Sequence, residues 1–268
     1  MSGEDQYISS TQNPKIKRLL ALQEKSSERR KSGLFVVEGR RELQHCVEAG
    51  YEIESIFKLA SAADAADADF IVSPHVYERI AYRGSTEGVV AIVRAKPHTL
   101  EDLLPSLTGG VGGGSLFIVL ESVEKPGNLG AVLRSADAAG ATAVIVCDPL
   151  TDLYNPNLIR ASIGACFTVP TVACSSEDCI RFLKTHGVQI LTAQLQDSHL
   201  YYDTDMTGPT AIVMGTESTG LTDQWRQAAD AHIRIPMLGR LDSLNVSVSA
   251  AILLFEAVRQ RENMGLST

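Results

Sequence analysis

Strands and helices alternate regularly over the second part of this chain, and this alternation constrains the fold more than any other feature. Short apolar runs that predict strands occupy residues 116–120, 143–147, 168–171, 189–193, 210–214 and 232–236. Segments with helical periodicity follow at 129–139, 155–164, 176–186, 223–229 and 243–261. Because strand–helix–strand units join parallel strands, the pattern predicts an α/β fold with a mainly parallel sheet that helices cover on both faces.

The first part of the chain predicts a smaller α/β domain. Residues 10–30 carry Pro14 in the first turn and repeat apolar residues at helical spacing, which predicts a basic amphipathic helix. Further strands are predicted at 34–37, 53–59, 69–72 and 88–94, and helices at 39–49 and 74–81. Residues 108–115 contain five glycines and precede a strand, which indicates a linker, because a dinucleotide-binding loop follows a strand and opens a helix. We therefore expect domains at 1–107 and 116–268, joined by a linker at 108–115.

The composition bounds the class of protein. Of the 268 residues, 44% are hydrophobic and 21% are charged, and no apolar run is long enough to span a membrane. The N-terminus has neither a signal peptide nor a transit peptide pattern, so we expect a cytoplasmic protein with no membrane role. The net charge of -8 argues against a nucleic-acid-binding protein. However, residues 13–41 carry nine Lys and Arg against three acidic residues, so basic charge is concentrated where RNA could be held.

Cysteine and histidine spacing indicates no metal site. The five cysteines are Cys46, Cys147, Cys166, Cys174 and Cys179, and no two of them form a C-x-x-C pair. Several lie within apolar runs, so buried thiols are expected rather than disulfides, zinc ligands or a nucleophile. The six histidines are scattered and form no H-x-x-x-H pair.

Three segments carry polar residues at loops where predicted strands meet predicted helices. The first, residues 124–141, contains Asn128 and Arg134; the second, residues 212–221, contains Gly215 and Glu217. Each residue also has a purely structural interpretation: Asn128 as a helix cap, Arg134 in a surface ion pair, and Glu217 as an acidic residue in a first helical turn.

The third segment, residues 235–256, joins a strand to the final helix. It contains Ile235 and the run Ser243-Leu244-Asn245. Ser243 and Asn245 are natural helix caps, an interpretation that is compatible with a functional role.

In order and spacing, these segments resemble the three signature motifs of the SpoU/TrmH family of RNA ribose 2′-O-methyltransferases, within the SPOUT superfamily. The resemblance implies a dimeric enzyme that uses S-adenosyl-L-methionine, with a trefoil knot formed by the C-terminal segment. It implies that the catalytic residues are Asn128, Arg134, Glu217, Ser243 and Asn245. The residues it implies for cofactor binding are Gly215, Ile235 and Leu244, and it implies no metal. The segment before the linker resembles, more weakly, the L30e-like RNA-binding domain that often precedes such catalytic domains.

RNA is the partner that this resemblance implies, and the N-terminal basic residues are the candidate contacts. These are Lys15, Lys17, Arg18, Arg40 and Arg41. Ribosomal RNA is favoured over tRNA, because the added N-terminal domain resembles those of rRNA-modifying members. A non-catalytic RNA-binding protein with this fold and a nucleotide-dependent metabolic enzyme are the alternatives, the latter disfavoured because the chain lacks a dinucleotide-binding fingerprint.

The chemistry of methyl transfer to a ribose oxygen sets the expected role of Arg134. Family precedent makes Arg134 the catalytic residue, sometimes described as a general base. A guanidinium that keeps its proton is a poor base, so we favour a charged clamp on a substrate phosphate and on the developing alkoxide.

Overall fold

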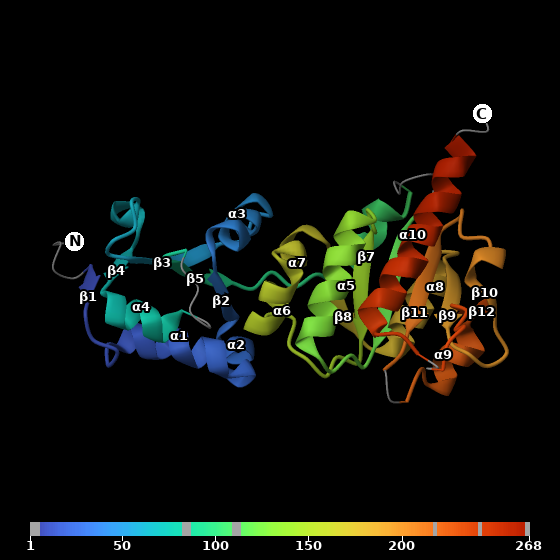
Figure 1. The fold of residues 1–268 in the computed structure, drawn as a ribbon, viewed down its shortest axis with the longest axis horizontal. Coiled ribbons are helices and arrows are strands. Elements are labelled where there is room, and N and C mark those ends of the chain that lie inside the picture. Colours follow the sequence, from blue (N-terminus) through green and yellow to red (C-terminus); the bar gives the residue numbers. More distant parts are fainter. Residues whose placement is uncertain (1–5, 82–86, 109–113, 217–218, 241–242, 266–268) are drawn as a thin grey trace. The chain divides into compact units, whose positions relative to one another are not determined.

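The structure, a computed structural model, describes residues 6–81, 87–108, 114–216, 219–240 and 243–265. Contacts divide the chain into two compact units (Figure 1). The smaller unit consists of Met1–Lys96 with Asp152–Thr168, and the larger unit consists of Pro97–Thr151 with Val169–Thr268. This division differs from the expected boundaries, because residues 97–107 belong to the larger unit and residues 152–168 to the smaller one. Residues 109–113 of the expected linker lie outside the described residues.

The smaller unit is a mixed sheet between two layers of helices. Its strands, in the order β1-β4-β3-β5-β2, are β1 (Tyr7–Ile8), β4 (Phe70–Val72), β3 (Ile53–Leu59), β5 (Val89–Arg94) and β2 (Leu34–Glu38). Its helices are α1 (Pro14–Glu24), α2 (Ser26–Ser32), α3 (Arg40–Glu48), α4 (Pro74–Ile80), α6 (Pro156–Ser162) and α7 (Ala165–Thr168), with a short 3₁₀ helix η1 (Ala65–Asp67). Side chains of α1 and α4 pack on one face of the sheet, and those of α3, α6 and α7 pack on the other. Strands β3 and β4 are parallel, whereas β5 is antiparallel to both of its neighbours.

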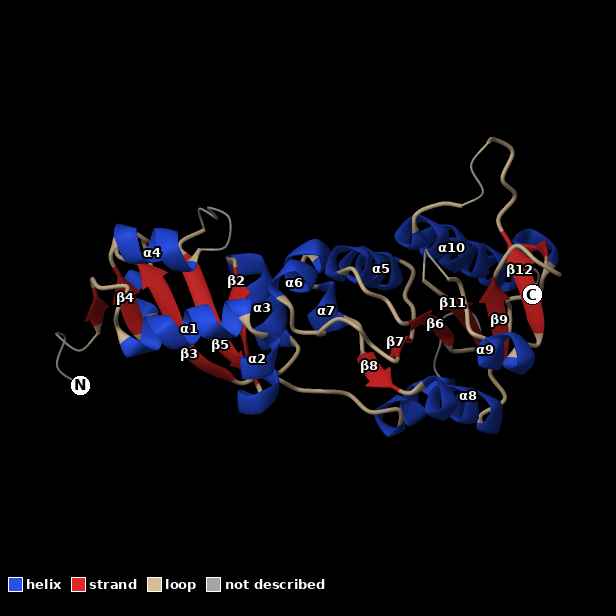
Figure 2. Cartoon of the chain, turned by 90° about the horizontal axis from the view of Figure 1, so that it is seen from below, coloured by secondary structure: helices blue, strands red, loops and turns tan. Residues whose placement is uncertain are grey.

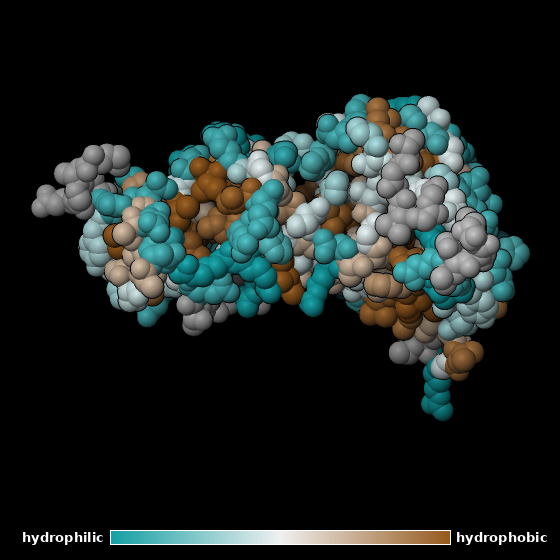
Figure 3. Space-filling model, turned by 90° about the horizontal axis from the view of Figure 1, so that it is seen from above, coloured by the Kyte–Doolittle hydropathy of each residue, from teal (hydrophilic) through white to brown (hydrophobic). Residues whose placement is uncertain are grey.

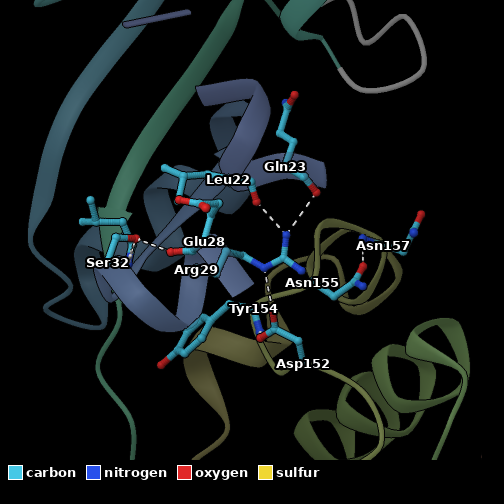
Figure 4. Close-up of polar contacts among 10 residues, drawn as sticks. Leu22, Gln23, Glu28, Arg29, Ser32, Asp152, Tyr154, Asn155 and Asn157 are labelled. Atoms are coloured by element: carbon cyan, nitrogen blue, oxygen red, sulfur yellow. Dashed lines mark hydrogen bonds and ion pairs between the residues drawn. The ribbon is translucent and has the colours of Figure 1, made fainter. Parts of the chain in front are cut away.

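The predicted helix at 10–30 is two helices, and Arg29 explains the break. Lys25 adopts an extended conformation between α1 and α2. The Nη1 group of Arg29 then donates to the carbonyl oxygens of Leu22 (2.6 Å) and Gln23 (3.0 Å), which lie in the last turn of α1 (Figure 4). A buried cation therefore satisfies carbonyl groups that the end of α1 would otherwise leave without partners.

The same arginine connects these helices to residues 152–168, which lie more than a hundred positions later in the chain. Its Nε atom donates to Asp152 Oδ2 at 2.5 Å, and the two side chains are only 5% and 12% exposed (Figure 4). Beside this pair, the Tyr154 ring stacks on Phe35 with 4.4 Å between centroids, and Phe167 stacks on Phe35 at 5.9 Å. An ion pair and an aromatic cluster thus attach the segment to the smaller unit.

We expect Arg29→Met to destabilise the smaller unit by about 3 kcal/mol, because it leaves the Asp152 carboxylate and two helix-end carbonyls without their cationic donor. Arg30→Met, on the exposed neighbour, should cost less than about 0.5 kcal/mol. Native-state hydrogen exchange of the amides in β2 and β5 measures the opening free energy of this unit alone. Equal protection in the two variants would contradict the role assigned to Arg29.

The larger unit contains a seven-stranded sheet in which every pairing is parallel. Its strands, in the order β10-β12-β9-β11-β6-β7-β8, are β10 (His199–Leu200), β12 (Ala231–Arg234), β9 (Gln189–Ala193), β11 (Thr210–Met214), β6 (Leu116–Glu121), β7 (Ala143–Cys147) and β8 (Thr171–Cys174). Its helices are α5 (Pro126–Ala138), α8 (Ser176–Thr185), α9 (Asp223–Ala228) and α10 (Val246–Gly265), with 3₁₀ helices η2 (Glu101–Thr108) and η3 (Tyr201–Asp203). Helices α5 and α10 cover one face of the sheet, and α8 and α9 cover the other (Figure 2).

The predicted α/β class and mainly parallel sheet are confirmed, with differences in where some elements begin. The strand predicted at 168–171 is Thr171–Cys174, because residues 165–168 form the additional helix α7. The first helix of this unit begins at Pro126 rather than at 129, since Pro is well suited to the first position of a helix. Among the described residues, no helix has the length and apolar character needed to cross a membrane.

Candidate active site

The topology of the larger sheet marks one place for a ligand site. Strands β6 and β11 pair in parallel, but the order β6-β7-β8 runs toward one edge and β11-β9-β12 toward the other. Loops that leave the carboxyl ends of β6 and β11 therefore diverge, and such a switch point is where open α/β sheets bind ligands. The loops after β6, β9, β11 and β12 contribute to two cavities in this region.

The larger cavity brings together residues that the sequence assigned to one binding function. It has a volume of about 350 Å³, within the range of small-molecule sites. Gly215, Ile235 and Leu244 all contribute to its wall, together with Ser243. These residues come from two segments that follow β11 and β12, so the fold places the second and third sequence motifs around one space.

Position 215 requires a glycine because two segments of the chain approach each other closely there. A Cβ atom at this position would lie 2.2 Å from the carbonyl carbon of Gly220 and 2.5 Å from the amide nitrogen of Leu221. The sequence argument expected glycine here so that a ligand could approach the backbone, whereas the structure shows that the returning loop already occupies that side. Gly220, at φ +68°, completes the turn that brings the loop back.

The smaller cavity lies between the loops after β6 and β11 and has a volume of about 110 Å³. Its wall includes Asn128, and Gly215 contributes to both cavities. Asn245 Nδ2 donates to Asn128 Oδ1 at 3.2 Å, which joins the first and third motifs across 117 positions of sequence. Asn128 is the third residue of α5 and Lys125 is its N-cap, so the interpretation of Asn128 as a cap is wrong.

Asn245 has a second role at the start of α10. Its Oδ1 atom accepts hydrogen bonds from the backbone nitrogen of Ser247 (3.0 Å) and from Ser247 Oγ (2.6 Å). This is the geometry of an N-cap, so helix formation orients the amide whose nitrogen faces Asn128. The cap interpretation and the functional interpretation therefore apply to the same residue.

A buried carboxylate holds the far end of the Gly215 loop. Glu121, at the end of β6 and 2% exposed, accepts hydrogen bonds from the backbone nitrogen (2.8 Å) and the hydroxyl (2.6 Å) of Thr222. Ser176 Oγ lies 3.3 Å from Glu121 and accepts from the indole nitrogen of Trp225 at 3.0 Å. The loop after β11 is thus fixed at Gly215 by close packing and at Thr222 by charge-assisted hydrogen bonds.

Two predicted catalytic residues are not brought into these cavities by the described contacts. Arg134 lies on α5, six positions after Asn128, with an exposed side chain, and it is not among the residues that line either cavity. Glu217 lies outside the described residues. Their predicted roles stay predictions.

The basic residues of the smaller unit are exposed, but several are paired. Arg40 forms a forked pair with Asp64 at 2.7 and 2.8 Å, and this guanidinium with the Lys58 ammonium holds the pKa of Asp64 well below its usual range. Arg18 pairs with an acidic residue at 2.8 Å, and Arg41 does so at 2.9 Å. The ammonium of Lys15 lies 4.4 Å from the centre of the Phe70 ring, and Lys17 is exposed.

Sequence reasoning missed part of the larger cavity's wall. Gln194 and Gln196 in the loop after β9, and the cations Arg226 and Arg234, also line it. The predicted parallel sheet could have indicated the two glutamines, because the carboxyl end of β9 lies at the same edge of the sheet as those of β11 and β12.

This arrangement defines a class of protein: an α/β fold with a cavity of small-ligand size at the switch point and paired amides beside it. Comparison with known proteins then identifies the family. Residues 115–255 match the SpoU rRNA methylase family, and residues 13–91 match the MRM3-like substrate binding domain. The chain belongs to the SpoU rRNA methylase family, as the sequence motifs predicted.

Individual relatives agree with this placement. The chain is 41% identical over 179 residues to the 23S rRNA (guanosine-2'-O-)-methyltransferase RlmB of Yersinia pestis. The aligned residues cover 66% of this chain and 72% of that protein. A solved RNA 2'-O ribose methyltransferase is 39% identical, with a TM-score of 0.82 over 96% of this chain and 99% of that one. The AdoMet-bound rRNA methyltransferase of Sinorhizobium meliloti is 30% identical, with a TM-score of 0.84 over 94% of this chain and 97% of that one.

Proposed function

We propose that this protein transfers a methyl group from S-adenosyl-L-methionine to a ribose 2′-hydroxyl of ribosomal RNA. The observation that carries the proposal is the cavity at the switch point, where Gly215, Ile235 and Leu244 meet beside the Asn128–Asn245 pair. By their names, the Yersinia relative and the solved RNA 2'-O ribose methyltransferase act on RNA ribose, and the Sinorhizobium rRNA methyltransferase is bound to this cofactor, in agreement with the proposal. The guanosine of 23S rRNA named for the Yersinia relative is the first target to test.

The cavity suits the proposed cofactor in size and in lining. Leu221, Ile235 and Leu244 offer apolar surface for an adenine ring. The polar side chains of Gln194 and Ser243 line the same space and can hydrogen-bond to the ribose or the amino-acid part. When bound, the cofactor supplies a sulfonium methyl group that the ribose oxygen accepts as the carbon–sulfur bond breaks.

We expect Gly215→Ala to weaken S-adenosyl-L-methionine binding about tenfold or more, because the new Cβ must displace the backbone at Gly220 and Leu221. Gly208→Ala is the matched control, since a Cβ there meets nothing within 4 Å and the residue lies before β11 rather than in the loop after it. Isothermal titration of the cofactor into each folded variant measures both affinities. Unchanged affinity in Gly215→Ala would show that the loop does not form the cofactor site.

The chain's own side chains would orient the ribose rather than supply covalent chemistry. The carboxamides of Asn128 and Asn245 lie beside the cofactor cavity and come from two helices that start there. Rigid donors and acceptors at this position can align the 2′-oxygen with the methyl group, a positioning effect that accounts for several kcal/mol in many enzymes. Arg134 would clamp a phosphate of the incoming RNA and stabilise the charge that develops on the oxygen, and Glu217 would hold Arg134 or Asn245 in place.

Transfer of labelled methyl to rRNA and tRNA from a strain that lacks this protein tests the function and the role of Arg134 together. We expect the wild-type enzyme to form a 2′-O-methylated nucleoside in the rRNA pool. Arg134→Lys should lower kcat about 10- to 100-fold with unchanged cofactor affinity, because an ammonium cannot reproduce the forked contact. Arg181→Lys, exposed on α8, is the control and should retain full activity.

The outcomes of this assay separate the alternatives. Methylation of the tRNA pool alone would replace the rRNA proposal by the tRNA alternative. Cofactor binding without transfer to either pool would favour the non-catalytic alternative. A near-full rate for Arg134→Lys would contradict the clamp.

We also propose that the smaller unit binds RNA through its exposed lysines. Lys15 and Lys17 lie on the exposed side of α1, whereas Arg18, Arg40 and Arg41 already pair with carboxylates of the same unit. Three of the five predicted basic residues are therefore already paired with acidic residues. The two lysines are the stronger candidates for contacts with RNA.

Substituting Lys15 and Lys17 by Ala should weaken RNA binding and reduce the salt dependence, with a slope of log K against log salt that is smaller by about 1 to 2. The doubly substituted Arg181→Ala, Lys184→Ala chain loses the same charge from α8 and should keep the wild-type slope. Filter binding over a range of salt concentrations gives both slopes. Equal slopes in the two double variants would contradict the assignment.

We further infer a cytoplasmic homodimer with the knotted C-terminus that the family resemblance implies. Val248 and Phe255 lie two turns apart on α10, and each is 47% exposed. Exposed apolar residues at this spacing form one stripe along the helix, which suits a self-complementary interface. Figure 3 shows hydrophobic patches at the surface of the larger unit among hydrophilic residues.

A further inference from the structure

Three cysteines that are far apart in the sequence meet at the carboxyl edge of the larger sheet. Cys147 ends β7 and Cys174 ends β8, and the two are direct partners across these parallel strands. Cys179 lies in the first turns of α8, which begins directly after β8. The three Sγ atoms all lie within 4.8 Å of one another, and we call these residues the thiol cluster.

We propose that the thiol cluster binds a soft, thiophilic divalent cation of the Zn²⁺ or Cd²⁺ type. In tetrahedral thiolate sites the metal–sulfur distance is about 2.3 Å, which places sulfur atoms about 3.8 Å apart. The three Sγ atoms, all within 4.8 Å of one another, are thus already gathered to nearly this spacing. The cation would join β7, β8 and α8 and is separate from the methyl-transfer chemistry.

A hollow beside the cluster offers access and a fourth donor. Cys147 and Cys179 are fully buried, but Cys174 is partly exposed and lines a space of about 540 Å³. His98 and Asp178 line the same space. A water molecule from this side would complete four-coordination around three thiolates.

The other two cysteines lie apart from this cluster. Cys46 and Cys166 belong to the smaller unit, whereas all three members of the thiol cluster belong to the larger one. The spacing argument expected no metal site because no two cysteines form a C-x-x-C pair, whereas strand pairing brings Cys147 and Cys174 side by side.

Titration of Cd²⁺ into the full-length, reduced and chelator-treated protein tests the proposal through the ultraviolet thiolate-to-metal charge-transfer band. We expect one equivalent to bind. Cys174→Ser should weaken binding at least about tenfold, because it removes one of three thiolate ligands. Cys166→Ser, also partly buried, is the matched control and should bind as the wild type does.

Thermal unfolding gives a second readout that does not depend on activity. At one fixed Zn²⁺ concentration, Tm of the wild type and of Cys166→Ser should rise by more than Tm of Cys174→Ser. The proposal is overturned if the wild type shows no charge-transfer band, or if Cys174→Ser binds equally well. It is also overturned if mass spectrometry of the untreated protein finds a disulfide within the cluster in place of free thiols.

Discussion

The parallel pairing of β6 with β11 is the constraint on which the rest of the site depends. The chain leaves these neighbouring strands toward opposite edges of the sheet, so their carboxyl ends open a space that no crossover helix fills. The loop after β11 then folds back so tightly that Gly215 touches the backbone of Gly220 and Leu221. Glu121 fixes the other end of that loop through Thr222. Packing and buried hydrogen bonds thus shape the cavity before any ligand arrives.

The polar groups that face this space lie at the N-terminal ends of two helices. Asn128 lies in the first turn of α5, and Asn245 immediately precedes α10. Because the amide of Asn245 is oriented by capping its own helix, its contact with Asn128 costs little additional ordering. The hydrogen bonds that begin α10 therefore also position the Asn245 amide in the site.

Much of this architecture could be predicted from the sequence, because apolar runs of strand length alternate with helical periodicity. The motif residues Gly215, Ile235, Leu244 and Ser243 line one cavity, and the roles assigned to them from the sequence stay predictions. The break at Lys25 could not be predicted, since it depends on Arg29 and its partner Asp152, which are distant in sequence. Other contacts between residues that are distant in sequence could not be predicted either. Cys147 and Cys174 are brought together by strand pairing, and Arg40 pairs with Asp64 within the smaller unit.

A crystal structure of the protein with S-adenosylhomocysteine, the product of methyl transfer, tests the central claim most directly. The account predicts that the ligand occupies the cavity formed by the loops after β9, β11 and β12, with its adenine beside Ile235 and Leu244. Its sulfur atom should point toward the Asn128–Asn245 pair. Binding at any other edge of the sheet, or with the sulfur directed away from these amides, would contradict the account.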